Sequence, residues 1–524
     1  MKNIFKYLWV SAALLPFLTG CNSLDLESES TITDANYWKS DTHFSAFNVG
    51  LHAQLRERSY NFFILGEPRA DIYGDAPFGG EATQGMEIFP ANSLNRENVG
   101  LSNFANLYGV INQINLMIAK TEDTGLLPEA TKKYYLGEAY GMRAFLYFHL
   151  LRSWGDVILH LTYTSGSTID LANIQKAASP ATEVMAHIKE DITASETAFN
   201  GDYSYKYGKH YWSLGATKML KGEVYLWSGK QMGGGEADYR TAKTALQEVD
   251  NCPGIDLEDN FTNVFAYANK KNKEIIFTIH NGRDEYNMWN GSFRGNLVPQ
   301  QAYMTSGSYF DENGVSFAET KDAELNGLIR FQINKVFREG DTRKAGSVKA
   351  VYMKEGENLV YKACIPYKFQ GTMLPGGSER AWLDDYPIYR YADCLLLLAE
   401  AKALLGEDIA TEINTVRRRA YGETYFEANK ATVAYPNEKG GEFYSGNPFV
   451  AGDDDPIEAV LKERLRELMY EGKRWYDIRT LGYTAKYSTA NEKRLLWPID
   501  ANTLTNNREL GQTEGYLTSG EGEE

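Results

Sequence analysis

The sequence is poor in cysteine and histidine, with four and seven of them in 524 residues. So few cysteines exclude a dense disulfide framework. The histidines are scattered, and no spacing typical of a zinc site occurs. Signatures of a serine nucleophile, a zinc protease or a phosphate-binding glycine loop are also missing. We therefore expect no cofactor, no bound metal and no catalytic residues.

Basic residues are outnumbered, since 54 lysines and arginines face 70 aspartates and glutamates, and the formal net charge is −16. Nucleic-acid binding needs a basic surface, so this balance argues against it. The chain also lacks an apolar run of membrane-spanning length after its first twenty residues. We expect a mature protein that is tethered to a membrane and not embedded in it.

The tether is predicted by the N-terminal segment. Lys2 and Lys6 precede an apolar run over 8–18, and the sequence Leu18-Thr19-Gly20-Cys21 follows. This order is typical of a bacterial lipoprotein signal. A transmembrane anchor or a buried helix is the alternative, but the run is shorter than the ~20 residues that span a bilayer. We predict a signal peptide at 1–20, lipid attachment at Cys21, a lipidated tether at 21–39 and a single domain at 40–524.

Helical periodicity dominates this domain. Apolar residues at helical spacing predict helices over about 40–55, 104–120 and 129–154. A Gly-x-x-Tyr element begins at Gly137 and again at Gly222, where small residues allow close helix contacts. Residues from 391 to about 420 form a helix pair close to the ~34-residue tetratricopeptide period. We predict a mostly α fold of tetratricopeptide-like helix pairs with minor β-structure. An irregular helical bundle is the alternative.

Between about 252 and 386 the pattern changes to a loop-rich region. A short apolar run over 274–280 predicts one β-strand. The stretch that follows combines glycine, asparagine and aromatic residues with little periodicity. Loops of this length in a compact protein usually carry function, and so many rings argue against disorder.

The last long helix is predicted to begin at Asp455-Pro456, an acidic cap followed by proline in the first turn, and to run to about Leu481. It carries a dense set of charges, which we interpret as a salt-bridged helix surface. These charges are Glu463, Arg464, Glu467, Glu471 and Arg474.

Five segments in order carry a resemblance to a known family. They are Gly137 to Asp156, Asp341-Thr342-Arg343, Tyr386 to Ala401, Lys462 to Arg479, and the tail that contains Leu496-Trp497-Pro498-Ile499 and Leu510 to Tyr516. Together they resemble the SusD/RagB family of surface lipoproteins from Bacteroidetes. Ile158, Arg508 and Glu514 stand where the family has prolines.

The resemblance implies a SusD-like α-α superhelix that binds a nutrient without chemistry. It further implies a lipid-anchored protein on the outer membrane, facing the cell exterior, which captures oligosaccharides and delivers them to a SusC-like TonB-dependent transporter. A peptide-binding RagB-like lid has the same fold and is the alternative. A glycoside hydrolase is a further alternative, although adjacent acids such as Asp384-Asp385 point in different directions along the chain.

A carbohydrate site needs exposed rings with polar groups at their edges. Aromatic residues of the loop-rich region and an early loop that combines charge, ring and turn residues meet this need best. Core packing or contact with the transporter is the alternative for each ring. The predicted glycan-binding residues are Trp289, Phe293, Tyr303, Tyr309, Trp382, Arg69, Asp71 and Tyr73.

Overall fold

A computed structural model describes residues 37–74, 86–100, 103–165, 170, 172, 174–285, 287–289, 306–320, 333–377, 380–441 and 450–517. The predicted signal peptide, Cys21, Phe293 and Tyr303 lie outside the described residues.

The α-helices within these ranges are α2 (Asp41–Glu57), α3 (Ser59–Gly66), α4 (Tyr108–Asp123), α5 (Glu129–Trp154), α6 (Ala181–Phe199), α7 (Leu214–Gln231), α8 (Gly235–Gln247), α11 (Phe317–Thr320), α12 (Arg343–Ser347), α13 (Tyr391–Leu404), α14 (Ala410–Tyr421), α15 (Glu423–Ala428), α16 (Lys430–Val433), α17 (Pro456–Leu468), α18 (Arg474–Thr480), α19 (Thr484–Tyr487) and α20 (Ala501–Asn506). The strands are β1 (Ile275–Ile279), β2 (Val348–Glu355), β3 (Asn358–Pro366), β4 (Thr372–Met373), β5 (Arg380–Ala381) and β6 (Tyr386–Arg390).

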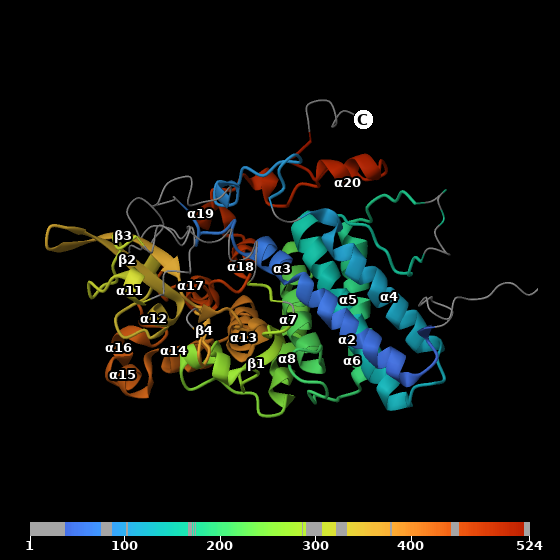
Figure 1. Cartoon of the computed structure of the whole chain (residues 1–524), viewed down its shortest axis with the longest axis horizontal. Coiled ribbons are helices and arrows are strands. Elements are labelled where there is room, and N and C mark those ends of the chain that lie inside the picture. Colours follow the sequence, from blue (N-terminus) through green and yellow to red (C-terminus); the bar gives the residue numbers. More distant parts are fainter. Residues whose placement is uncertain are drawn as a thin grey trace, which may run out of the picture.

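The helices form the larger part of the molecule. In Figure 1, α2, α4, α5 and α6 make one side, α7, α8 and α13 lie in the middle, and the β2–β3 hairpin with α14 to α16 makes the other side. The pairs α5–α6, α7–α8 and α13–α14 pack helix against helix. This arrangement confirms the predicted mostly α fold with tetratricopeptide-like helix pairs.

Glycines on α5 permit its close contacts. The helix has the bounds that the sequence predicts, Glu129–Trp154. A Cβ added to Gly137 would lie 2.8 Å from the ring of Phe199 on α6. A Cβ added to Gly141 would lie 2.0 Å from Nε1 of the buried Trp212. Only a residue without a side chain fits at these two positions.

Substituting Gly141→Ala is therefore expected to lower the free energy of unfolding by about 1–3 kcal/mol, because the methyl group overpacks the core against Trp212. Gly50→Ala on α2 is the matched control, since its Cβ would meet nothing within 4 Å. A helical glycine in open space gains up to about 1 kcal/mol on becoming alanine. Urea unfolding of both variants checks the contrast, and equal changes would contradict it.

The loop-rich region is attached to the helices by β-structure. Strand β1 is fully buried and pairs antiparallel with β6, which leads directly into α13. The other strands form two separate pairs, β2–β3 and β4–β5. The predicted strand at 274–280 is thereby confirmed; β1 packs against α7, and its partner β6 packs against α13.

The last long helix is interrupted, which corrects the prediction of a continuous helix to Leu481. Helix α17 ends at Leu468, and α18 begins at Arg474. Between them Tyr470 and Gly472 have positive φ values of 71° and 72°. A Cβ on Gly66 would lie 1.8 Å from the carbonyl oxygen of Gly472, so the backbones of α3 and this turn cross in near contact.

The charges of this segment lie inside the protein, and the expectation of an exposed salt-bridged surface is wrong. Glu467 is fully buried and accepts hydrogen bonds from Arg390 at 2.7 Å and Arg343 at 3.2 Å, and also from Arg419. Glu463 pairs with Arg343 at 2.6 Å. These arginines come from α12, β6 and α14, so the network joins the loop-rich region to the helical scaffold.

Candidate functional site

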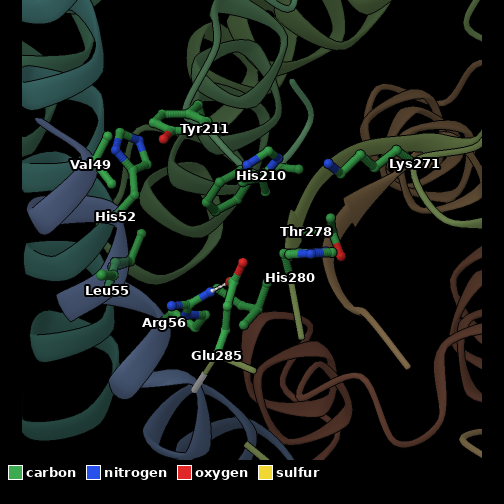
Figure 2. Close-up of a pocket in the computed structure, with 13 residues that line it drawn as sticks. Val49, His52, Leu55, Arg56, His210, Tyr211, Lys271, Thr278, His280 and Glu285 are labelled. Atoms are coloured by element: carbon green, nitrogen blue, oxygen red, sulfur yellow. Dashed lines mark hydrogen bonds and ion pairs between the residues drawn. The ribbon is translucent and has the colours of Figure 1, made fainter. Parts of the chain in front are cut away.

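A cavity of about 400 Å³ lies where α2, the segment before α7 and strand β1 meet. Figure 2 shows the side chains of α2 on one side of this space and those of the other two segments across from them. The lining is rich in polar nitrogen atoms. It consists of Val49, His52, Ala53, Leu55, Arg56, His210, Tyr211, Lys271, Phe277, Thr278, Ile279, His280 and Glu285.

Helix α2 positions two of these groups by its periodicity. His52 and Arg56 are four residues apart and project from one face, while Leu51 and Leu55 are buried in the core. Arg56 Nη1 donates to Glu285 Oε2 at 2.5 Å (Figure 2). This hydrogen bond lowers the pKa of Glu285. The Glu285 side chain is 52% exposed, so the pair contributes at most about 1 kcal/mol and can open for a ligand.

His52 has a fixed protonation state. Its Nε2 accepts the backbone N–H of Trp212 at 3.0 Å, so its Nδ1 carries the proton and donates to the Asn48 carbonyl at 2.9 Å. Burial lowers the pKa of His52 to about 4. The imidazole is therefore neutral at pH 7 and connects α2 to the segment before α7.

The far wall of the cavity combines imidazoles with an ammonium group. Burial lowers the pKa of His210 to about 4, and the neighbouring Lys271 and His280 act in the same direction. Nδ1 of His280 lies 3.0 Å from Oδ1 of Asp385. Burial alone would raise the pKa of Asp385, but its hydrogen bonds to His280 and Lys270 outweigh burial and lower it.

The arrangement suits binding more than catalysis. His210 offers a neutral imidazole, whereas both ring nitrogens of His52 are already engaged, and Arg56 and Lys271 add charged donors. Among the described residues of the lining, Glu285 is the one carboxylate, and it is engaged by Arg56. Among the described residues, no three His, Cys, Asp or Glu side chains lie close enough to hold a metal ion.

Comparisons with known proteins place the chain in a family. The SusD family model matches residues 257–488. The solved structure of B. fragilis NanU is 63% identical, covers 94% of this chain and 100% of its own, and superposes with a TM-score of 0.88. A SusD superfamily protein from Bacteroides vulgatus is 59% identical over 92% of this chain and 100% of its own, with a TM-score of 0.86. The chain belongs to the SusD family.

More distant SusD-family structures share the fold alone. A laminarin-binding SusD-like protein is 20% identical over 91% of this chain and 100% of its own, with a TM-score of 0.65. At that identity the likeness shows that the helical scaffold is common to both proteins, and it does not carry over a ligand.

The early loop that contains Arg69, Asp71 and Tyr73 is packed inside the protein. The guanidinium of Arg69 is 4.6 Å from the Trp475 ring and donates to the carbonyls of Arg494, Leu495 and Leu496 at 2.5, 3.2 and 2.8 Å. Arg69 is 1% exposed, so it holds the C-terminal segment in place and offers no donor to a ligand. This corrects the prediction that it belongs to the binding site.

Asp71 and Tyr73 are corrected in the same way. The Asp71 carboxylate accepts two hydrogen bonds from Arg474, both at 2.8 Å. The Tyr73 ring is buried, with its centroid 6.4 Å from that of Tyr470. The charge and ring of this loop therefore fix the turn that separates α17 from α18.

The two predicted tryptophan platforms are also buried. Trp289 is 5% exposed, its Nε1 donates to the Asp384 carbonyl at 2.7 Å, and its ring centroid lies 4.7 Å from that of Phe369. Trp382 is 5% exposed and packs against Gly371. Neither ring has a free face for a sugar. Tyr309 is partly buried against a small core that contains Phe317.

The cavity was not predicted from the sequence. Its residues come from three separate parts of the chain, at 49–56, 210–211 and 271–285. A local signal was present in the segment 203–212, where tyrosine alternates with lysine and histidine between two helices. Such a cluster of amphipathic side chains in a connecting segment is typical of a binding loop.

Proposed function

We propose that this protein is a cell-surface lipoprotein that binds carbohydrate and delivers oligosaccharides to a SusC-like TonB-dependent transporter of the outer membrane. Membership of the SusD family supports the proposal. Binding without chemistry is part of the proposal.

The observation that carries it is the cavity between α2 and β1. Its volume of about 400 Å³ lies in the range of small-molecule sites. Among the described residues of the lining, nitrogen donors from Arg56, Lys271 and His210 outnumber the carboxylate of Glu285. A ligand that presents many oxygen acceptors, such as the hydroxyl or carboxylate groups of a sugar, satisfies them.

The anchor belongs to the same proposal. Acyl chains on Cys21 would hold the domain at 40–524 on the membrane surface through the tether at 21–39. In the part of the chain that the structure describes, no helix combines the length and apolar character required to cross a bilayer. Mass spectrometry of the protein from outer-membrane fractions tests the acylation directly.

Replacing Arg56 by alanine tests the cavity as the binding site. Arg56→Ala is expected to weaken carbohydrate binding at least about tenfold, the value of a lost charge-assisted hydrogen bond. The free energy of unfolding should change by less than about 1 kcal/mol, because its pair with Glu285 is solvent-screened. Calorimetry with neutral and acidic glycans measures the affinity, and a urea titration measures the free energy of unfolding.

Arg240→Ala is the matched control, since Arg240 lies outside the cavity lining and its pair with Glu236 on α8 is exposed. Unchanged affinity in Arg56→Ala would remove the cavity from the site. Binding of peptides in place of glycans would favour the RagB-like alternative, and release of sugar products from any glycan would show an enzyme.

A further inference from the structure

A second cavity, of about 570 Å³, lies between the short 3₁₀-helix η9 (Ile333–Val336), the helices α15 and α16, and the segment 437–441. Figure 1 shows α15 and α16 on the side of the molecule away from α2, and the two cavities share no lining residue. The apolar part of the lining is buried and includes Val336, Phe337 and Val433. This cavity is therefore separate from the candidate carbohydrate site.

The charged part of its lining is strongly basic. Four basic side chains and, among the described residues, one acidic side chain line the cavity. They are Lys335, Arg338, Lys439, Arg466 and Glu339. The whole chain has a formal net charge of −16, so the sign of the charge is reversed here. Because a concave site lined by one sign of charge concentrates its electric field, the cavity favours an anion.

Arg338 is held in one orientation and still has an amino group to offer. Its Nε donates to Glu438 Oε1 at 2.6 Å, and its Nη2 donates to the carbonyl of Lys439. Nη1 makes no hydrogen bond within the described part of the chain, and the side chain is 39% exposed. A guanidinium fixed in this way can donate to a carboxylate or phosphate oxygen with little further loss of rotamer freedom.

The charge of Arg338 is only partly balanced by Glu438, because four cations share that carboxylate. Its oxygens also lie 2.7 Å from Arg466, 3.2 Å from Lys462 and 3.5 Å from Arg417. Attraction to these cations outweighs burial and lowers the pKa of Glu438. Without Arg338, Glu438 would keep three cationic partners, so removal of Arg338 leaves no buried charge unpaired.

The two lysines of the lining add charge that the protein hardly neutralises. Lys335 is exposed and makes no ion pair with any described residue. Nζ of Lys439 lies 3.8 Å from Oδ1 of Asp454, and both side chains are more than 75% exposed, so solvent screens this pair. Together with Arg338, the lysines can engage more than one anionic group.

We propose that this cavity binds a small anion that carries two or more carboxylate or phosphate groups, with Arg338, Lys335 and Lys439 as its charged contacts. The volume of about 570 Å³ lies in the range of small-molecule sites. The buried apolar residues of the lining accommodate the carbon skeleton of such a ligand. The site goes beyond the proposed carbohydrate binding and does not depend on it.

Calorimetry with citrate and with pyrophosphate tests the site at low ionic strength, where charge interactions are least screened. We expect the wild type to bind at least one of these probes. Arg338→Ala should weaken that binding at least about tenfold, the effect of one lost charge-assisted hydrogen bond. Lys335→Ala should weaken it roughly two- to fivefold. Binding of citrate alone would assign a carboxylate ligand, and binding of pyrophosphate alone a phosphate ligand.

Arg418→Ala is the matched control for Arg338→Ala. The Arg418 side chain is also 39% exposed and pairs with a glutamate at 2.6 Å, but it lies outside the cavity lining. Its loss should leave the affinity for the anionic probes unchanged. Arg56→Ala should also leave anion binding unchanged, and Arg338→Ala should leave glycan binding unchanged. The carbohydrate function and the anion site can therefore fail separately.

Two results would overturn the anion site. One is the absence of saturable binding of either probe to the wild type, and the other is an equal effect of Arg338→Ala and Arg418→Ala on probe affinity. If Arg338→Ala does not fold, Lys335→Ala takes its place, because the exposed Lys335 makes no ion pair with any described residue. Unchanged probe affinity in Lys335→Ala would then reject the proposal.

Discussion

Replacing Arg390 by alanine is expected to lower the free energy of unfolding by about 5 kcal/mol or more, enough to prevent folding of a protein of ordinary stability. Arg390 is 1% exposed and donates to Glu274 at 2.7 Å, Glu467 at 2.7 Å and Glu471 at 2.8 Å. Its removal leaves three buried carboxylates without their shared cation. Breaking one buried pair already costs about 3–5 kcal/mol.

Denaturant unfolding and soluble yield measure this effect, with Arg240→Ala again as the control. Arg240 also pairs with a glutamate, but both side chains are more than 60% exposed, so its loss should cost less than about 1 kcal/mol. Arg390→Lys should remain strongly destabilised, because an ammonium cannot reproduce the planar fork that engages several carboxylates. A cost below about 1 kcal/mol for Arg390→Ala would show that the network tolerates its loss.

The buried charge network around Arg390 also shows which features could not be predicted from the sequence. The 26 residues of α5 were predictable to the residue because a cap-proximal proline, helical periodicity and a terminal glycine are all local signals. The burial of the charged side chains on α17 was not predictable from the sequence. Glu463 and Glu467 are buried because Arg343, Arg390, Arg417 and Arg419 pair with them, and each of these partners is 46 or more residues away in the chain.

For the candidate site, too, local sequence signals were not enough, because contacts between distant segments decide which side chains are exposed. Glycine-rich, aromatic loops predicted exposed platforms, but glycine also permits tight packing, and Gly371 lets Trp382 pack against the backbone. Trp289 is buried against Phe369 for a different reason, because its Nε1 donates a hydrogen bond to the Asp384 carbonyl. The cavity depends on three distant segments, which no local pattern brings together. Family resemblance was predictable, whereas the position of the site required the fold.

The second large effect concerns pH and the buried Glu400 of α13. Its side chain is 2% exposed, and its Oε1 has no hydrogen-bond partner among the described residues. Burial raises its pKa to about 8, and the neighbouring Asp477 and Asp393 add to the rise while Arg464 opposes it. The carboxyl is therefore protonated in the folded protein at pH 7, and ionised once the chain unfolds.

The sign of the pH dependence follows from linkage. Because the folded-state pKa exceeds the ordinary value of 4.5, the contribution of Glu400 to stability is complete below pH 4.5 and is lost as the pH rises through about 8. Each pH unit in that window costs about 1.4 kcal/mol. Glu400→Gln carries no ionisable proton, so its stability relative to the wild type should rise by roughly 4 kcal/mol between pH 5 and 8.

Urea unfolding of the wild type and Glu400→Gln at pH 5, 6, 7 and 8 measures this difference, with Glu236→Gln as the exposed control. The control should show no such trend, because the Glu236 side chain is 72% exposed and its pair with Arg240 lies on the surface, so folding changes its surroundings little. A difference between wild type and Glu400→Gln that stays constant with pH would mean that Glu400 is already ionised in the folded protein, stabilised by Arg464. A widening difference would identify Glu400 as a buried neutral acid within the helical scaffold.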